Sequence, residues 1–450
     1  MFLRSSSRNL LLIIAAALLV LYLGYYQPLG FVRWSPQTDF HISSSSSRFF
    51  SSDPSASQRE KIESKDANTH LHRSRPASTH PLLYGPTYTG HSTPSDINRV
   101  TNSTLGFSKV FVVGLPERTD KRDALTLLSA VTGFDIEWVD GVKGESVSDK
   151  AIPWRTDRKK LWESNLGSWR GHLDAVRRIV DESLSSALIM EDDMDWDVRL
   201  KPQLERIAQG SRALLPYPTP PQSFLSHTHP PSSPYGDDWD ILWLGHCGEL
   251  FPELLDENRG RSAADPGLQY MARKFVISDD LTVPSRSRVT GLIDFGNAPE
   301  HTRWVHLTGA PICSFAYALS QSGARKVLYD MSVGRDEVEA PFDNTLARLC
   351  QRSVSSWTPA PFSDSGLDSP GGEGRGDSGL DTRCISVTPP IFFHHRPRGP
   401  MSGDSDIQNG SGGEDVRQKG SSENIVWSAR LNVGRMIKGE SWMENQFGDI

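Results

Sequence analysis

Hydrophobic and polar residues alternate in blocks that predict a strand, a helix and a second strand where the ordered chain begins. Residues 109–114 read KVFVVG, an apolar run of strand length. After a polar turn, residues 124–131 place Leu and Val at helical spacing, and residues 134–139 form a second short apolar run. A strand, a helix and a strand within about 30 residues make a βαβ unit, so this pattern predicts a mostly parallel sheet.

The same pattern continues through the chain. A helix over residues 166–182 leads into a buried strand that ends at residue 190, and another helix begins near residue 322. Further strands are predicted at residues 239–245, 304–307, 312–319 and 385–393. This order predicts an α/β fold class, with a mostly parallel central sheet flanked by helices in a single domain.

The N-terminal residues predict a membrane anchor. Residues 10–26 are apolar or aromatic throughout, and Arg4 and Arg8 precede them. Basic residues before a span keep the N-terminus in the cytosol, so we expect residues 1–9 to be a cytosolic tail and the remainder to be luminal. A cleaved signal peptide is the alternative, but its small residues (15–17, AAA) lie within the run rather than after it. The expected location is the Golgi or ER membrane, with single-pass type II topology.

Composition divides the remaining chain into three parts. Residues 27–104 are rich in Ser, Pro, Thr and His, and they predict a disordered stem. Residues 105–400 hold the predicted strands and helices, and they form the expected folded domain. Pro-rich and Gly/Ser-rich stretches predict insertions near residues 210–236 and 351–382. Residues 401–450 are mostly polar and are expected to form a loose C-terminal tail, in which residues 425–427 and Trp442 are candidates to dock on the domain.

Bulk composition narrows the possible partners. The chain has 450 residues, of which 37% are hydrophobic, and this is enough for a large core. Its formal net charge of -7 gives no electrostatic support for a nucleic-acid partner. The four cysteines are widely spaced and indicate no zinc site, although one or two disulfides can form in an oxidising compartment. The sequence leaves their connectivity open.

An acidic run follows the strand that ends at Met190. Glu191, Asp192, Asp193 and Asp195 would repel one another at the end of a buried strand, and a divalent cation such as Mn²⁺ or Mg²⁺ would relieve this. Strand alternation places either Glu191 with Asp193, or Asp193 with Asp195, on one side. Asp193 belongs to both pairs and is the favoured ligand. The alternative is a solvated acidic turn.

Other candidate site residues lie in polar segments beside predicted strands. The turn after the first strand contains Arg118 and Arg122, which could contact the phosphate or base of a bound nucleotide, and Asp120, which could contact its ribose. Alternatively, these residues form an ordinary helix start. His172 lies on the helix before the acidic strand and is either a site residue or a structural histidine. Only one of His394 and His395 can point inward on a strand, and we expect His394 as a metal ligand; the alternative is that both are surface histidines.

Asp343 is the candidate general base. It follows Pro341 and Phe342 and lies outside the acidic run, as a group that takes a proton from an acceptor hydroxyl must. Asp336, Glu337 and Glu339 are nearby competitors, and helix capping or solvent exposure is the alternative role for all four.

Several motifs resemble, in order, those of glycosyltransferase family 25, which includes lipooligosaccharide and procollagen galactosyltransferases. They are residues 112–122 (VVGLPERTDKR), 140–141 (DG), 167–172 (GSWRGH), 187–193 (ALIMEDD), 315–326 (FAYALSQSGARK), 341–343 (PFD) and 389–392 (PPIF). The chain departs from the family at Ser168 and Trp169, where many members carry Cys, and at Gly171, where Ser usually precedes the His. These differences, together with the insertions, leave the acceptor unassigned.

The resemblance implies a function. It implies a GT-A-like fold, a nucleotide-sugar donor such as a UDP-sugar, and transfer of a sugar such as galactose with inversion. The acceptor would be a hydroxyl of a glycan or glycoprotein, and a metal at Asp193 would hold the donor's phosphates. The alternative is an inactive luminal protein that binds a nucleotide sugar or glycan on the same fold. A metal-dependent phosphoesterase is a weaker alternative, because it usually requires a second metal site.

Overall fold

The structure, a computed structural model, describes residues 98–214, 231–291, 293–334, 340–354, 379–401, 406 and 415–448. The predicted cytosolic tail, membrane anchor and most of the stem lie outside the described residues, as do the centres of both predicted insertions. None of the helices in these ranges is long and apolar enough to span a bilayer. The fold begins earlier than predicted, because η1 (Asn98–Thr101) buries Val100 beside Leu105.

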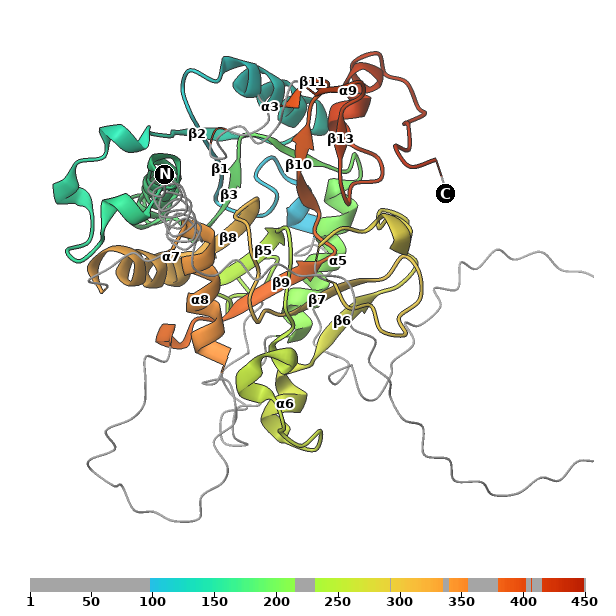
Figure 1. The fold of residues 1–450 in the computed structure, drawn as a ribbon. Helices are drawn as coiled ribbons and strands as arrows, with labels where there is room; N and C mark the ends of the chain where they lie inside the picture. Colours follow the sequence, from blue (N-terminus) through green and yellow to red (C-terminus); the bar gives the residue numbers. More distant parts are fainter. Residues whose placement is uncertain are drawn as a thin grey trace, which may run out of the picture. The chain divides into compact units, whose positions relative to one another are not determined.

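The main sheet has eight strands in the order β2-β1-β3-β8-β5-β9-β7-β6 (Figure 1). Their bounds are β1 (Lys109–Gly114), β2 (Glu137–Asp140), β3 (Ser186–Glu191), β5 (Ile241–Gly245), β6 (Lys274–Ile277), β7 (Arg303–Leu307), β8 (Ala316–Ser320) and β9 (Cys384–Thr388). β1 runs parallel to β2 and β3, and β5 runs parallel to β9, whereas the other four pairings are antiparallel. The α/β class is therefore confirmed, but the prediction of a mostly parallel sheet was wrong.

The error has a physical reason. β8 lies antiparallel between β3 and β5, and its buried side chains make the same continuous apolar run that a buried parallel strand makes. An apolar run indicates that a strand is buried, but it carries no information about its direction. Only the first half of the sheet, where β1 and β2 are joined by a helix, follows the predicted βαβ connection.

The α-helices of the described residues pack on the sheet. They are α3 (Thr119–Thr132), α4 (Glu163–Asp181), α5 (Leu200–Leu214), α6 (Pro266–Met271), α7 (Gln321–Leu328), α8 (Phe342–Val354) and α9 (Ala429–Ile437). α4 packs on β1, β2 and β3 and contacts α7 and α8. α5 packs on β6 and β7 (Figure 1). The side of α4 that carries Leu166, Leu173, Val176 and Ile179 is buried, as its helical spacing predicts.

The C-terminal segment is folded rather than loose. β10 (Phe392–Arg396) pairs antiparallel with β4 (Met194–Trp196) and with β13 (Ser421–Ser422), and β11 (Gly399–Pro400) pairs with β12 (Val416–Arg417). α9 then packs against α3 and β4. Described residues 415–448 therefore form part of the domain, unlike the loose tail expected from their polar composition.

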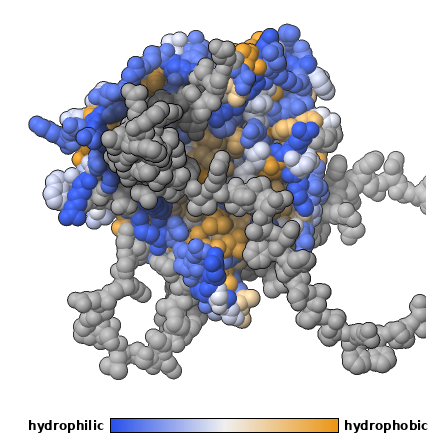
Figure 2. All heavy atoms as spheres, viewed as in Figure 1, coloured by the Kyte–Doolittle hydropathy of each residue, from blue (hydrophilic) through white to orange (hydrophobic). Residues whose placement is uncertain are grey.

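The core follows the apolar runs. Leu188, Ile189 and Met190 of β3 are completely buried, as are Phe111 and Val112 of β1. On the face shown in Figure 2, hydrophilic residues dominate the outer surface that is coloured, and hydrophobic residues show in hollows between them. All described residues belong to one compact unit, which agrees with the prediction of a single domain.

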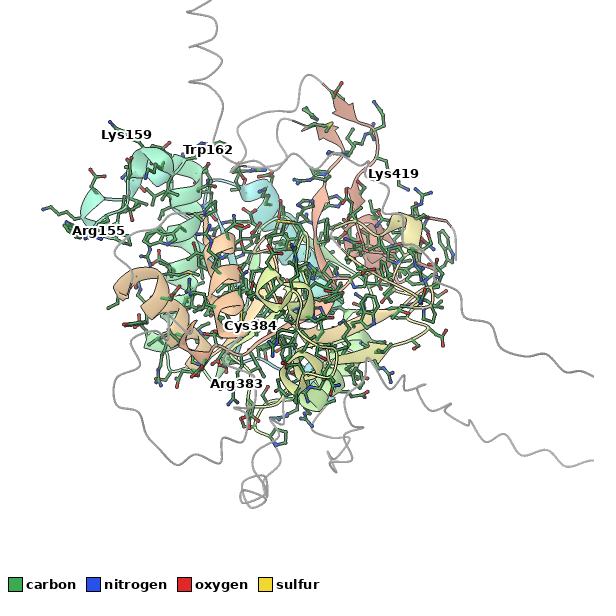
Figure 3. The ribbon with its side chains drawn as sticks, turned by 60° about the horizontal axis from the view of Figure 1, so that its bottom comes forward. Arg155, Lys159, Trp162, Arg383, Cys384 and Lys419 are labelled. Atoms are coloured by element: carbon green, nitrogen blue, oxygen red, sulfur yellow. A yellow bond between two sulfur atoms is a disulfide. The ribbon has the colours of Figure 1, made fainter. Side chains whose placement is uncertain are left out.

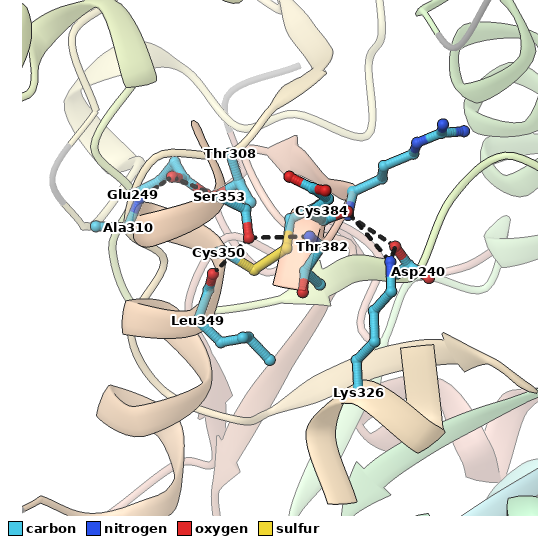
Figure 4. Close-up of a disulfide and its surroundings, with 12 residues drawn as sticks. Asp240, Glu249, Thr308, Ala310, Lys326, Leu349, Cys350, Ser353, Thr382 and Cys384 are labelled. Carbon is cyan, nitrogen blue, oxygen red and sulfur yellow. Dashed lines mark hydrogen bonds and ion pairs between the residues drawn. A yellow bond between two sulfur atoms is a disulfide. The ribbon is translucent and has the colours of Figure 1, made fainter. Parts of the chain in front are cut away.

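All four cysteines form disulfides. Cys247 pairs with Cys313, and Cys350 pairs with Cys384. The second bridge joins α8 to the start of β9 (Figure 4), close to Asp240, which accepts a hydrogen bond from Lys326 Nζ at 2.6 Å. The first bridge ties the end of β5 to the loop before β8, and this loop reaches the candidate site.

Candidate functional site

A cavity of about 680 Å³ lies where β1, β2 and β3 reach their carboxyl ends. The turn between β1 and α3, residues 141–145 after β2, the acidic run after β3 and the N-terminal half of α4 line it. Ligands of open α/β sheets bind in the crevice outside the carboxyl ends of the strands. The cavity therefore occupies the sheet edge at which the sequence analysis expected a ligand.

Three carboxylates of the acidic run line this cavity. Glu191 ends β3, and Asp192 and Asp193 form the turn that leads into β4. Gly114 of β1 lies directly against this turn, since a Cβ atom at Gly114 would stand 2.6 Å from Asp192 Oδ2. The acidic turn can pack on β1 only because Gly114 has no side chain.

Asp195 lies outside the cavity. It is completely buried, and its carboxylate accepts hydrogen bonds from Trp196 N at 2.8 Å, from Arg430 N at 3.1 Å and from the hydroxyls of Ser422 and Ser428. These partners belong to β4 and to the C-terminal segment. In the described structure Asp195 therefore anchors this segment and is not placed beside Asp193 as a second ligand.

Two cations accompany the acidic run. Lys121 of α3 lines the cavity and donates to Asp192 Oδ1 at 2.7 Å. Burial disfavours its charged form, but the charges of Asp193 and Asp192 outweigh burial and raise the pKa of Lys121. Arg430 of α9 donates to the carbonyl oxygen of Met194 at 2.9 Å, and burial lowers its pKa. These cations balance part of the negative charge of the run.

The remaining charge fits a bound cation. Burial and the charge of Asp193 raise the pKa of Glu191 to about 8, although Ser314 Oγ donates to Glu191 Oε1 at 2.8 Å. Asp193 Oδ1 is buried and has no hydrogen-bond partner in the part of the chain that the structure describes. A divalent cation would satisfy this oxygen and keep Glu191 ionised.

The ligand set is small. Over the described ranges, no group of three or more His, Cys, Asp or Glu side chains is placed to hold a metal ion. Mg²⁺ and related cations are often held by one or two carboxylates, with substrate phosphates and water completing the coordination. Glu191 and Asp193 fit a cation that binds together with a phosphate-bearing ligand.

His172 lies beneath Glu191. It is 1% exposed, its ring stacks on Phe342 with centroids 4.6 Å apart, and its Nδ1 lies 3.0 Å from the Tyr317 hydroxyl. Burial lowers its pKa to about 3, so His172 is neutral at physiological pH. Its Nε2 lies 3.5 Å from Ser314 Oγ, the group that donates to Glu191. His172 thus reaches the cavity wall, and its polar contacts support Glu191.

Asp343 lies beside the site but does not line the cavity. It sits in the first turn of α8, and its Oδ2 accepts a hydrogen bond from Cys313 N at 3.0 Å. The charge of Asp343 contributes to the raised pKa of Glu191, which places the two carboxylates in one electrostatic environment. The Cys247–Cys313 disulfide holds the loop that contacts both, through Cys313 and the adjacent Ser314.

The predicted donor-binding residues of the first turn take different positions. Arg118 lines the cavity, forms a bidentate pair with Asp120 at 2.8 and 2.9 Å, and also pairs with Asp406. The hydrogen bonds from Arg118 lower the pKa of Asp120 to about 2. Lys121 Nζ lies 3.0 Å from the same Asp406 carboxylate. Arg118 and Lys121 therefore already hold one anionic group at the cavity wall.

Arg122 and His394 lie outside the cavity lining. Arg122 donates to the carbonyl oxygen of Gly114 at 3.1 Å and to Asp140 at 2.5 Å, which joins the ends of β1 and β2. His394 lies on β10, and its ring stands 4.6 Å from that of Phe315. The structure thus brings together Arg118, His172, Glu191 and Asp193, with Asp343 nearby. The predicted residues outside the cavity lining are Asp120, Arg122, Asp195 and His394.

Comparison with curated proteins gives relatives that are named as procollagen galactosyltransferases or as glycosyltransferase 25 family members. Procollagen galactosyltransferase 1 of Danio rerio is 28% identical over 152 residues, which is 31% of this chain and 22% of that protein. The glycosyltransferase 25 family member of Anopheles gambiae is 25% identical over 138 residues, 27% of this chain and 23% of that protein. This chain is related to glycosyltransferase family 25. The resemblance seen in its motifs is confirmed, although the chain spans only about a fifth of the length of these relatives.

Two further findings qualify the relationship with family 25. The human inactive glycosyltransferase 25 family member 3 is 27% identical over 124 residues, 25% of this chain and 20% of that protein. No protein-family model matches the chain.

Three residues of the site were missed in the sequence analysis. Lys121 lies in the same first turn as Arg118, so its position could have marked it as a second cation. Trp162 lines the cavity from the residue before α4, and Ser314 supports Glu191 from the loop before β8. No local pattern distinguishes these two from ordinary loop residues.

Proposed function

We propose that this chain is a glycosyltransferase that binds a nucleotide-sugar donor in the cavity at the ends of β1, β2 and β3. The observation that carries the proposal is the pairing of two kinds of charge on one cavity wall. Asp193 offers a buried oxygen beside Glu191 that has no partner among the described residues, and Arg118 and Lys121 already hold an anionic carboxylate. A diphosphate that arrives with a divalent cation complements both sets of charges.

The donor's phosphates would contact Arg118 and Lys121. Glu191 and Asp193 would hold a Mn²⁺ or Mg²⁺ ion, which supplies Lewis-acid stabilisation of the leaving diphosphate. Ser314 and His172 keep the Glu191 carboxylate in place, because Ser314 donates to it and His172 contacts Ser314. These buried contacts hold the Glu191 carboxylate in position before the donor binds, and such preorganisation favours catalysis.

Asp343 would accept the proton from the acceptor hydroxyl. The acceptor oxygen forms a bond to the anomeric carbon as the bond to the diphosphate breaks, and the sugar is transferred with inversion. The location of Asp343 beside Glu191, with one oxygen held by Cys313 N, supports this role.

The relatives' names suggest the sugar and the acceptor class. Galactosyltransferases among them support galactose as the sugar and a hydroxyl on a glycan or glycoprotein as the acceptor. A luminal location in the Golgi or endoplasmic reticulum, with an N-terminal anchor, belongs to the same proposal. The two disulfides support it, because disulfides persist in oxidising compartments.

A second candidate function is nucleotide-sugar binding without transfer. Two observations favour it: one relative is named inactive, and Asp343 does not line the cavity. The two candidates share the donor site and differ in the chemical step.

A donor panel tests the proposal. Purified full-length protein is incubated with Mn²⁺ and a series of UDP-sugars, and release of UDP is measured. Wild type should release UDP from one donor, and Asp193→Asn should abolish release while the exposed control Asp123→Asn retains it. Binding of UDP without release supports the second candidate, whereas absence of both contradicts the proposed donor site.

A further inference from the structure

Trp162 is an exposed tryptophan on the wall of the cavity. Its side chain is 63% exposed although it lines the same cavity as Arg118 and the acidic run. Large aromatic side chains usually bury most of their surface, so an exposed one inside a ligand cavity marks a candidate contact surface. Figure 3 shows its position beside Lys159, on the segment that leads into α4.

The position of Trp162 along α4 sets its distance from the acidic run. Trp162 immediately precedes α4, and His172, which lies beneath Glu191, comes ten residues later. A helix rises 1.5 Å per residue, so the two levels are about 15 Å apart. Ser164 and Ser168 line the cavity between them at a spacing of four residues. The wall thus runs from Glu191, above His172, to Trp162. Its length of about 15 Å is comparable with that of an extended nucleoside diphosphate.

The loop after β2 packs closely against the start of α4, next to Trp162. A Cβ atom at Gly144 would stand 1.8 Å from the Glu163 carbonyl oxygen, and one at Gly167 would stand 2.4 Å from the Val142 carbonyl oxygen. The loop after β2 therefore lies directly on α4. Such close backbone packing holds the loop and the start of α4 against each other on this side of the cavity.

Arg158 fastens the segment before Trp162. It donates to the carbonyl oxygens of Gly144 and Val147 at 2.7 and 2.6 Å, and to Glu163 at 2.9 and 2.7 Å. These bonds join Arg158 and Glu163, on the two sides of Trp162, to each other and to the loop after β2, so the segment that carries Trp162 is held in place. A contact residue on a fixed backbone loses little conformational freedom when the ligand binds.

Two kinds of ligand present a flat face to tryptophan: a nucleobase and a sugar ring. The nucleobase fits better, because Trp162 lines the same cavity as Arg118 and Lys121 and lies about 15 Å along α4 from the level of His172. Phosphates at the charged end place the base of the same molecule toward Trp162. Base stacking on an aromatic side chain is a general mode of nucleotide recognition.

We propose that Trp162 is the base-stacking residue of the donor site and that the cavity binds a nucleoside diphosphate along α4, with its base on Trp162. The inference rests on the proposed function and adds the residue that recognises the base of the donor. Loss of Trp162 should therefore weaken the binding of ligands that carry a base and leave the binding of a diphosphate without a base unchanged.

Isothermal titration of the full-length protein, in the presence of Mn²⁺, with UDP and with inorganic pyrophosphate tests this inference. Trp162→Ala should weaken UDP binding about tenfold or more, as loss of one base–aromatic stack would, while pyrophosphate affinity changes by less than about twofold. Trp162→Phe should retain most of the UDP affinity. Trp154→Ala is the matched control, because Trp154 is 80% exposed and does not line this cavity.

The outcomes separate the stacking role of Trp162 from the proposed donor site. UDP affinity that is unchanged in Trp162→Ala overturns the stacking role and leaves the donor site intact. Equal losses for UDP and pyrophosphate also overturn it, because they indicate general damage to the cavity. Failure of wild type to bind UDP overturns the proposed function itself, and the inference with it.

Discussion

Replacement of Asp195 separates a structural role from a metal-ligand role within the acidic run. Its carboxylate accepts two backbone N–H groups, Trp196 N and Arg430 N, and the hydroxyls of Ser422 and Ser428. In Asp195→Ala the hydroxyls can rotate toward other acceptors, but the two N–H groups stay buried without partners. Each unpaired group costs about 1–3 kcal/mol, so we expect a loss of about 4 kcal/mol in the free energy of unfolding.

Urea unfolding of wild type, Asp195→Ala and Asp195→Asn measures this loss. The asparagine amide oxygen can still accept the two N–H bonds, so its loss should be about half as large. UDP affinity, measured at a temperature where both variants are folded, should change by less than about twofold, because Asp195 lies outside the cavity. Unchanged unfolding together with lost UDP binding would refute the reasoning, because it would make Asp195 a ligand of the site.

Three further predictions concern other residues. Gly114→Ala should weaken UDP binding about tenfold in titration calorimetry, because its Cβ would displace the Asp192 carboxylate, and unchanged affinity would contradict this packing. Ser314→Ala should lower Mn²⁺ affinity at pH 7 about tenfold, because it removes the hydrogen bond that favours ionised Glu191, and unchanged Mn²⁺ affinity would exclude Glu191 as a ligand. Burial lowers the pKa of His246 from 6.5 to about 4. Between pH 6.5 and pH 4 the native state therefore binds fewer protons than the unfolded state, and the free energy of unfolding falls as the pH falls. His246→Gln should remove about 2 kcal/mol of the stability lost between pH 6.5 and 5, measured by urea unfolding, and an unaltered pH dependence would show that His246 is not the source.

Local patterns predicted the elements that build the cavity. The apolar run at residues 109–114, the helical spacing within α4 and the apolar lead into Glu191 each depend on neighbours in sequence, and each is present in the structure. The βαβ connection at the start also follows from local spacing. These elements alone place Arg118 and Asp193 at one sheet edge.

Contacts between distant segments could not be predicted in this way. Asp195 pairs with Ser422 and Ser428, more than two hundred residues later, and no local periodicity connects them. The turn at Asp192 and Asp193 also ended the strand alternation on which the predicted ligand pairs depended. The direction of β8 and the position of Trp162 likewise depend on tertiary packing rather than on the residues themselves.

The central claim is a donor site in which Asp193 binds the metal that accompanies the diphosphate. The most direct measurement is UDP affinity of the full-length protein with and without Mn²⁺, for wild type and for Asp193→Asn. The account predicts that Mn²⁺ strengthens UDP binding to wild type about tenfold or more and has little effect on the variant. UDP binding that depends equally on Mn²⁺ in both proteins would contradict it.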